Sequence, residues 1–438
     1  MKVSTLQKRK IKTLFEKMNS KDDFLALLNV SKETLYKNKS IPFSLKQLNY
    51  YLVKNSKKTA YNLIRSHYNK FEISKKSGGK RSIHAPEKGL KEFQKALNLI
   101  LQSVHAPNTR ATGFIQGKSI IDNASCHIGK NYVYNIDLKD FFPSIEASRV
   151  WGRLLIKPFN LGISEERKRI ANMIKTLCCT ELEVERLIEG KWKTQRKHVL
   201  PQGAPTSPTL TNAICDRLDR RLVGVAKRFG LSYSRYADDI TFSSDHNTYK
   251  NSNGEIESIY GNNDFMKLSN YIELKMLTSF QKELIRIVKD QKFHIKESKI
   301  RLQKRGYKQE VTGLIVNDKI NASRKYVKNI RQAIYFWERY GLKKAEQLFF
   351  KNYIKSKVNK SKGKPKLTMV IEGKLLYLKM IKGADSPIYL KLKERFDSLV
   401  RNEVNITPHK KKSLSQNLKV LSTLFEGGYE NALKKFIK

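Results

Sequence analysis

Residues 132–145 read YVYNIDLKDFFPSI, and residues 231–244 read LSYSRYADDITFSS. The first is an apolar, β-rich run around Asp137, and the second predicts two short strands joined by a turn with Asp238 and Asp239. Because adjacent strands of one sheet bring distant positions together, we expect these three carboxylates to cluster. Clustered carboxylates suit oxygen-seeking Mg²⁺, and two such ions about 4 Å apart promote phosphoryl transfer. Acid pairs also occur in solvated turns, so the pattern alone leaves that reading open.

The charge balance of the chain indicates a polyanionic partner. Among 438 residues, Lys and Arg number 87 against 40 Asp and Glu, which gives a net charge of +47. A phosphate polymer is the expected partner, with an acidic membrane as the rival. No run of about 18 apolar residues predicts a membrane-spanning helix, and the start of the chain lacks the apolar stretch of a signal peptide. The four cysteines form no C-x-x-C pair, so we expect neither a zinc ribbon nor a disulfide scaffold, and a cytoplasmic location.

The N-terminal third combines helical spacing with one β-hairpin. Residues 1–70 predict helices, with Ser31 as the N-cap of residues 32–37. Residues 71–86, FEISKKSGGKRSIHAP, predict a β-hairpin with a basic, flexible tip. A helix is expected next, because Leu90, Phe93, Leu97 and Ile100 recur at helical spacing.

The rest of the chain adds a loop, an insertion and a basic helical end. LPQGAPTSP at residues 200–208 predicts a loop with Ser207 as the N-cap of the next helix. Residues 245–265 are rich in polar residues and predict a surface insertion. The chain from residue 321 onward is helical in pattern and basic. Its segment 351–366 holds seven Lys and no acid, which predicts a linker or a phosphate-contacting loop.

Three of these segments together resemble bacterial reverse transcriptases of the non-long-terminal-repeat type. NIDLKDFFPSI, LPQGAPTSP and YADD match the family's motifs A, B and C in the family's order. The resemblance covers roughly residues 60–320 and implies an α+β right-hand polymerase fold, in which fingers, an antiparallel palm sheet flanked by helices and a helical thumb are joined. The implied division is an N-terminal helical region (1–70), fingers (71–130), palm (131–320, with the 245–265 insertion) and a basic helical thumb with a C-terminal RNA-binding extension (321–438).

The resemblance assigns catalytic roles to the acidic residues. Asp137 and Asp238 look like the two principal metal ligands, with Asp239 as the third acid of the cluster. The backbone of Leu138 would lie at the metal and the incoming triphosphate. Lys299 fits the motif D lysine that protonates departing pyrophosphate, although Lys296 stands where the family more usually has Asn. The implied cofactor is a pair of Mg²⁺ ions, with Mn²⁺ as a possible substitute.

The resemblance also assigns a nucleotide site. Phe142 matches the aromatic steric gate that excludes a ribose 2′-hydroxyl, which implies dNTP substrates; the alternative is an ordinary core aromatic. Gln202 and Gly203 match the motif B pair under the incoming nucleotide, where Gly permits close backbone approach. Arg81, and after it Lys76, match the fingers cations that hold the triphosphate, and Arg can do so with two parallel hydrogen bonds. A solvated surface role for any one of these lysines is the alternative.

Two short signatures narrow the resemblance to retron reverse transcriptases. Asn123-Ala-Ser-Cys-His127 matches N-A-x-x-H, and Val311-Thr312-Gly313 matches V-T-G. We assign both to the RNA-binding part of the enzyme; apart from the signature, a lone histidine such as His127 is more often a structural hydrogen bonder than a catalyst. The implied reaction copies a structured non-coding RNA that is both template and primer. Synthesis starts from the 2′-hydroxyl of an internal guanosine and yields branched multicopy single-stranded DNA, an RNA–DNA hybrid. An anti-phage role with an associated effector protein is also implied, and no membrane.

Other interpretations stay open on the sequence. A group II intron type of reverse transcriptase is one, although no maturase or His/Cys-rich endonuclease segment is evident. A non-catalytic RNA-binding module on a polymerase scaffold is another, against which the intact acids argue. In the basic C-terminal region four aromatic residues could stack on bases or form the core of a helix: Tyr335, Phe336, Trp337 and Tyr340.

Overall fold

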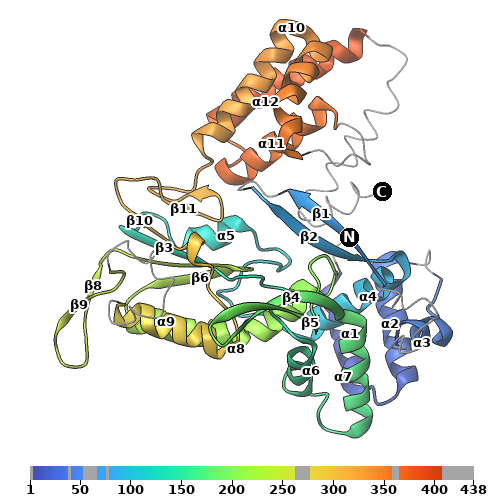
Figure 1. The fold of residues 1–438 in the computed structure, drawn as a ribbon. Coiled ribbons are helices and arrows are strands. Elements are labelled where there is room, and N and C mark those ends of the chain that lie inside the picture. The colour runs from blue at the N-terminus through green and yellow to red at the C-terminus, as the bar shows by residue number, and fades with distance from the viewer. Residues whose placement is uncertain are drawn as a thin grey trace.

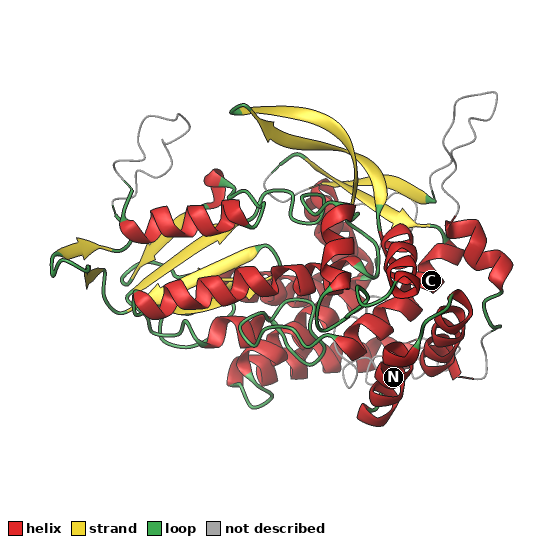
Figure 2. Ribbon diagram, turned by 90° about the horizontal axis from the view of Figure 1, so that it is seen from below, coloured by secondary structure: helices red, strands yellow, loops and turns green. Residues whose placement is uncertain are grey.

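The computed structural model describes residues 3–37, 41–52, 67–74, 78–261, 277–357 and 365–406. It combines helices with antiparallel sheets, and a helical bundle at the C-terminal end stands apart from a larger body (Figures 1 and 2). This confirms the predicted α+β class. None of the helices in these ranges is both long enough and apolar enough to cross a membrane.

The N-terminal region is helical, as predicted, over its described residues 3–37 and 41–52, whereas residues 68–70 already belong to the first strand. It consists of α1 (Thr5–Lys17), α2 (Lys21–Tyr36), α3 (Leu45–Leu52) and, after the first hairpin, α4 (Lys88–Val104). Capping boxes begin α1 at Ser4 and α2 at Ser20. The prediction that Ser31 caps a helix is wrong, because α2 runs through it and buries its side chain. The apolar face of α4 packs against α1 and α2 in the main core.

The predicted β-hairpin is present. It pairs β1 (Tyr68–Ser74) with β2 (Lys80–Pro86) in antiparallel register, and it lies between the C-terminal bundle and the helices of the main body (Figure 1). Gly78 and Gly79 at its tip both have positive φ, a conformation that favours glycine. Lys76 lies outside the described residues.

A four-stranded antiparallel sheet forms the centre of the body. Its order is β10-β3-β7-β6, from β3 (Tyr132–Asp137), β6 (Ser232–Tyr236), β7 (Asp239–Ser244) and β10 (Arg301–Lys304). The helices α8 (Ser207–Arg228) and α9 (Ser279–Asp290) cover one face (Figure 1). Phe280 of α9 meets the rings of Tyr134 and Phe242 there. Because side chains alternate along a strand, the residues between these aromatics face the opposite side.

The opposite face of the sheet is polar and holds the acids. Register places Asp137 opposite Asp239, and Tyr236 opposite Asp239. The next row along this face joins three polar residues, Asn135, Thr241 and Ser234. The short helix α5 (Ile120–Ser125) packs against β6. The alternation seen in the sequence therefore separates an apolar face for α8 and α9 from a polar face for chemistry.

The connections around the sheet carry further elements. They are α6 (Ala147–Leu155), α7 (Glu165–Cys178), the long hairpin β4 (Thr180–Ile188) and β5 (Lys191–Val199), the short hairpin β8 (Thr248–Lys250) and β9 (Ile256–Ser258), and the 3-10 helix η4 (Glu297–Lys299). Ser207 is the first residue of α8 and not its N-cap, which is Thr206. The prediction of a surface insertion at 245–265 is only partly right, because Ile259 and Tyr260 lie in the main core. Residues 262–265 of that segment lie outside the described residues.

The C-terminal bundle has its own core. It follows the small hairpin β11 (Glu310–Val311) and β12 (Leu314–Ile315), and contains α10 (Arg324–Lys357), α11 (Leu367–Lys382) and α12 (Pro387–Ile406). Gly341 interrupts α10 with a positive φ. The Lys-rich segment predicted as a linker belongs to α10 as far as residue 357; residues 358–364 and the tail after 406 lie outside the described residues.

Candidate active site

Three carboxylates meet at one end of the polar sheet face. Asp137 ends β3 and is buried, Asp239 begins β7 directly opposite it, and Asp238 occupies the two-residue turn between β6 and β7. The amide of Leu138 donates to the carbonyl of Asp238 at 3.1 Å and joins the two segments. Ala237, the other turn residue, has a φ of 58°, a strained conformation for a side chain with a Cβ. The predicted clustering of the acids is confirmed by this register.

The cluster carries uncompensated negative charge. Removal from water, and then repulsion by Asp137, raises the pKa of Asp238. Reduced solvation followed by the charges of Asp238 and Asp137 raises the pKa of Asp239, although its side chain keeps an exposed edge. A cation at this place would relieve both effects, because it favours the ionised carboxylates. The electrostatics therefore suit a cation-binding site.

Lys299 supplies one positive charge to this cluster. Its ammonium group forms an ion pair with the Asp137 carboxylate from η4, beside the edge strand β10. In the described ranges, no three His, Cys, Asp or Glu side chains are arranged as a metal-ligand set. The donors present are carboxylates, the ligand type that hard divalent cations prefer, so the residues fit Mg²⁺ or Mn²⁺. Leu138 forms a β-bridge with Ile295, but the two hydrogen bonds of this bridge run from the Lys139 amide to the His294 carbonyl and from the Lys296 amide to the Asp137 carbonyl. The bridge therefore does not use the Leu138 carbonyl, which is a further candidate metal ligand.

The β1–β2 hairpin brings a positive charge toward the acids. Arg81 on β2 is exposed, and its positive charge counteracts the rise in the pKa of Asp238. The amide of His84, on the same strand, donates to the carbonyl of Gln202 at 2.8 Å. The hairpin and the 200–208 loop are thereby fixed to one another. The structure brings Arg81, Gln202 and the carboxylates to one junction, where their roles in nucleotide binding remain predictions.

Gly203 occupies a position that excludes a side chain. Its φ is 127°, and a Cβ would lie 2.9 Å from both the carbonyl oxygen of His84 and Cγ2 of Ile83. The Gly203→Ala variant is expected to push the loop away from β2, which would raise the KM for dNTP and lower kcat. Steady-state primer extension would measure both. Unchanged constants would contradict a constraint at this glycine, and Gly224→Ala, with open space around its Cβ position, is the matched control.

The predicted steric gate, Phe142, is half-buried. Its ring lies 5.8 Å from that of Phe114 and 5.6 Å from that of Phe141. Phe114 also approaches the ring of Tyr236, at 6.4 Å, and so connects the gate to the turn with the acids. Sequence reasoning missed Phe114. Its φ of 63° shows that it is held in a strained backbone, a feature with no signal in the sequence.

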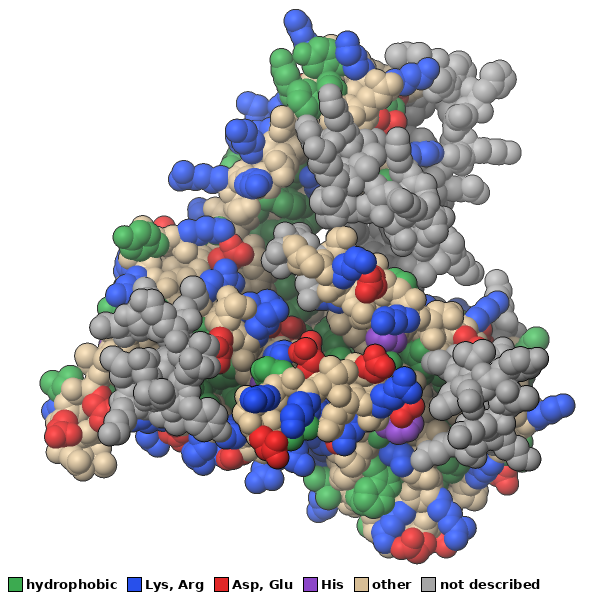
Figure 3. All heavy atoms as spheres, viewed as in Figure 1, with side chains coloured by type: hydrophobic (Ala, Val, Ile, Leu, Met, Phe, Trp, Pro, Cys, Tyr) green, Lys and Arg blue, Asp and Glu red, His purple; other side chains and the backbone are tan. Residues whose placement is uncertain are grey.

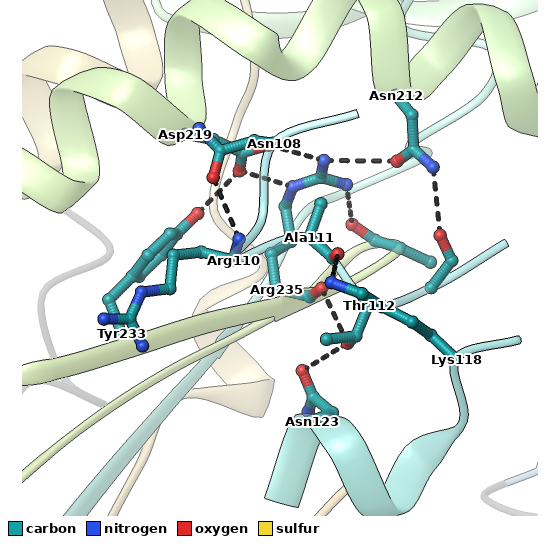
Figure 4. A network of polar contacts seen from close by, with 12 residues as sticks. Asn108, Arg110, Ala111, Thr112, Lys118, Asn123, Asn212, Asp219, Tyr233 and Arg235 are labelled. Atoms are coloured by element: carbon teal, nitrogen blue, oxygen red, sulfur yellow. Dashed lines mark hydrogen bonds and ion pairs between the residues drawn. The ribbon is translucent and has the colours of Figure 1, made fainter. Parts of the chain in front are cut away.

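A buried ion pair supports the turn from the α8 side, and sequence reasoning missed it as well. Arg235 donates to both carboxylate oxygens of Asp219 at 2.7 Å, and neither side chain is exposed (Figure 4). The same guanidinium donates to the Ala237 carbonyl at 3.0 Å, and Tyr233 donates to Asp219 at 2.7 Å. Although burial disfavours its charge, Asp219 raises the pKa of Arg235. The signal in the sequence is the alternation SYSRY, which places Arg235 on the inner face with Tyr233.

Of the two short signatures, N-A-x-x-H has its Asn and His in the interior, whereas V-T-G reaches the surface at its glycine. Asn123 and His127 are completely buried against the polar sheet face, so any effect on RNA passes through other residues in this conformation. Val311 is buried in the core of the C-terminal bundle, while Thr312 and Gly313 form the turn of the β11–β12 hairpin, and Gly313 is exposed. Contact between this turn and RNA remains a prediction.

The antiparallel central sheet, its covering helices and the helical C-terminal bundle fit the right-hand polymerase fold. The family model described as reverse transcriptase (RNA-dependent DNA polymerase) matches residues 73–316, more than half of the chain. The chain therefore belongs to the reverse transcriptase family.

Its relatives among curated proteins include bacterial retron enzymes. The chain is 34% identical over 269 residues to the retron Mx65 reverse transcriptase of Myxococcus xanthus, covering 61% of this chain and 56% of that protein. It is 38% identical over 179 residues to the retron Ec86 reverse transcriptase of Escherichia coli, covering 40% and 48%. The chain thus spans about half the length of the curated relatives it matches. These relatives confirm the retron resemblance. Among solved structures, a telomerase from Candida albicans covers 92% of this chain at 11% identity and a TM-score of 0.37, too weak a likeness for any argument.

Proposed function

We propose that the chain is an RNA-directed DNA polymerase that adds dNTPs to a growing strand on an RNA template. The observation that carries the proposal is the register that sets Asp137 opposite Asp239 with Asp238 in the adjoining turn. Membership of the reverse transcriptase family supports it. In the reaction, a hydroxyl oxygen attacks the α-phosphorus of the dNTP, and pyrophosphate leaves.

The residues of the chain divide the work of this reaction. Asp137 and Asp238 would hold the metal ions, with Asp239 adding negative charge beside them. When bound, two divalent cations activate the attacking oxygen and stabilise the leaving one. Arg81 would grip the triphosphate from the fingers side. Lys299 lies against Asp137 and would donate a proton to the departing pyrophosphate.

Discrimination between sugars gives a prediction for Phe142. Phe142→Ala is expected to raise ribonucleotide incorporation relative to deoxyribonucleotide by about 10-fold or more, the scale of one steric contact in a pocket. Its physical cause is the space opened where the half-buried ring now packs against Phe114. Competition between a dNTP and the matching rNTP in primer extension measures the ratio. An unchanged ratio would contradict the gate, and would favour the reading of Phe142 as a core aromatic.

The finer proposal is a retron reaction within an anti-phage system. The template and primer would be one structured non-coding RNA, and a guanosine 2′-hydroxyl would start synthesis of branched multicopy single-stranded DNA in the cytoplasm. An effector protein would bind the resulting complex. The retron relatives and the two short signatures support this proposal. A group II intron type of enzyme is the alternative.

The C-terminal bundle offers a surface for such an RNA. On α10, one face carries exposed side chains at helical spacing, which are Arg324, Lys328, Arg331, Tyr335 and Arg339. Lys and Arg side chains are prominent along this edge of the molecule (Figure 3). Of the four aromatic residues considered above, Trp337 is buried in the core, whereas Tyr335 and Tyr340 are exposed and available to stack on bases. Because Lys and Arg contact phosphate groups without sequence preference, this face of α10 would recognise the shape of the folded RNA and not its base sequence.

The experiment that tests the finer proposal examines nucleic acid that copurifies with the full chain from its native host. The expected result is a short DNA that separates from RNA only after treatment with a debranching enzyme. DNA that separates from RNA without debranching, or RNA with no attached DNA, would contradict the branched product. The family assignment would stand in either case, because it rests on the sequence match.

A further inference from the structure

The N-A-x-x-H segment contacts the catalytic hairpin directly. His127 Nδ1 lies 2.6 Å from the hydroxyl of Ser243 on β7, and its Nε2 lies 2.8 Å from the hydroxyl of Ser234 on β6. Ser234 stands two residues before Tyr236, and Ser243 four residues after Asp239. The imidazole therefore joins the two strands that carry the acidic turn, on the same sheet face as the acids.

Asn123, at the start of the N-A-x-x-H segment, also contacts this hairpin. Its side-chain oxygen accepts from the hydroxyl of Thr112 at 2.8 Å, and its backbone carbonyl accepts from Ser234 at 3.2 Å. Thr112 in turn donates its amide to the carbonyl of Arg235 at 2.9 Å (Figure 4). Beside it, Gly113 lies so close that a Cβ would be 2.5 Å from the amide nitrogen of Ala237. The segment thus reaches the turn through backbone and side chain together.

The burial of Asn123 and His127 excludes the simplest alternative, which is that they contact RNA directly. Both Asn123 and His127 have 0% exposure, and β6, β7 and the backbone of residues 110–113 surround them. Burial, and after it the charges of Arg110 and Lys130, lowers the pKa of His127 to about 3, so the ring is neutral and can donate through one nitrogen and accept through the other. A neutral buried ring cannot offer charge to a phosphate. Its two bonds are matched to two hydroxyls and leave no ring nitrogen for RNA.

We propose that Asn123 and His127 are positioning residues that lock β6 and β7 in register on the sheet face that carries the acids, so that the acidic turn at the end of these strands is held rigidly. This inference rests on the proposed polymerase function and deepens it. The segment that the sequence assigns to RNA binding would act on the rate of nucleotide addition instead. Misplacement of reacting groups by about 1 Å costs up to about 100-fold in rate, so a brace of this kind has a measurable effect.

The test removes the contacts of His127 with the two serines from either side, and the serine variant also loses the bond from Ser234 to the Asn123 carbonyl. One variant is His127→Gln, and the other is Ser234→Ala combined with Ser243→Ala, which leaves His127 in place. The matched control is Ser125→Ala, an exposed position in the same segment whose hydroxyl donates locally to the Asp122 carbonyl at 3.0 Å. The probes are a poly(rA)–oligo(dT) duplex and the RNA eluted from the purified wild-type protein.

Three readouts separate bracing from RNA contact. Both test variants are expected to speed amide hydrogen exchange in residues 232–244 and to lower kcat on poly(rA)–oligo(dT) by about 10-fold. Their affinities for the duplex and for the eluted RNA should match wild type, as should every readout for Ser125→Ala. Combining all three substitutions should cost less than the sum of the two separate effects, because both variants remove the contacts of His127 with the serines.

Two results would overturn the inference. In the first, His127→Gln loses RNA affinity but keeps its kcat, and the double serine variant matches wild type in every readout. This result would mean that His127 serves RNA binding. The other is unchanged hydrogen exchange in both variants. Because exchange needs no catalysis, a wild-type protein without any extension would refute the polymerase proposal and leave this test intact.

Discussion

Replacing Asp238 and Asp239 together by asparagine is expected to lower primer extension by about 10³-fold or more, the scale of losing a catalytic group. The amides keep the shape of the side chains but remove the charges that would hold two divalent cations. Affinity for the RNA–DNA duplex should persist, because the loss of two negative charges does not weaken attraction to phosphate. Extension rate and duplex affinity are measured on the same preparations.

The fold of this double variant should be intact. Removal from water, and after it repulsion within the acid cluster, raises the pKa of Asp238 and of Asp239, and neutral amides remove both costs. We therefore expect a melting temperature at least equal to that of wild type. Asp245→Asn is the matched control: this acid ends the same hairpin, is exposed and pairs with Lys130 at 2.6 Å. Substantial synthesis by the double variant would contradict the roles given to these acids.

Removing Asp219 is expected to give the second large effect. Asp219→Ala leaves the fully buried guanidinium of Arg235 without its partner, and breaking a buried pair in this way costs about 3–5 kcal/mol of the free energy of unfolding. Chemical denaturation measures the loss. Extension should fall with it, because the donation from Arg235 to the Ala237 carbonyl fixes the turn that carries Asp238.

A second variant separates stability from positioning. Asp219→Leu combined with Arg235→Met replaces the pair by apolar side chains, which is often neutral or stabilising for a buried pair. The free energy of unfolding should recover most of the loss, whereas extension should stay low, since Arg235→Met removes the donor to the Ala237 carbonyl. Full recovery of both quantities would show that the pair serves stability alone.

Part of the carboxylate cluster was predictable because its cause is local: a two-residue turn places Asp238 beside Asp239. Asp137 joins them through the pairing of β3 with β7, which the order of the motifs implied. The hairpin at 71–86 and the helix after it followed from turn residues and helical spacing in the same way. Gly203 was predicted from its match to motif B. The structure adds the reason that a glycine is needed there, which is the close approach of the His84 carbonyl.

What the sequence did not yield depends on contacts between distant elements. Arg235 and Asp219 lie on a strand and on a helix, and only their packing shows that they pair. His127 was assigned to RNA binding because a signature in the chain says nothing of burial, and the structure places it against Ser234 and Ser243. Ile259 was taken as part of a surface insertion because its neighbours are polar, yet it enters the main core.

The most direct test of the central claim is dNTP incorporation by the purified full chain on a defined RNA template annealed to a DNA primer. The account predicts DNA synthesis that requires the RNA template, is abolished by a chelator and is restored by Mg²⁺. It also predicts that rNTPs alone are not incorporated. The absence of synthesis with Mg²⁺ or Mn²⁺, or synthesis that persists in the chelator, would contradict it.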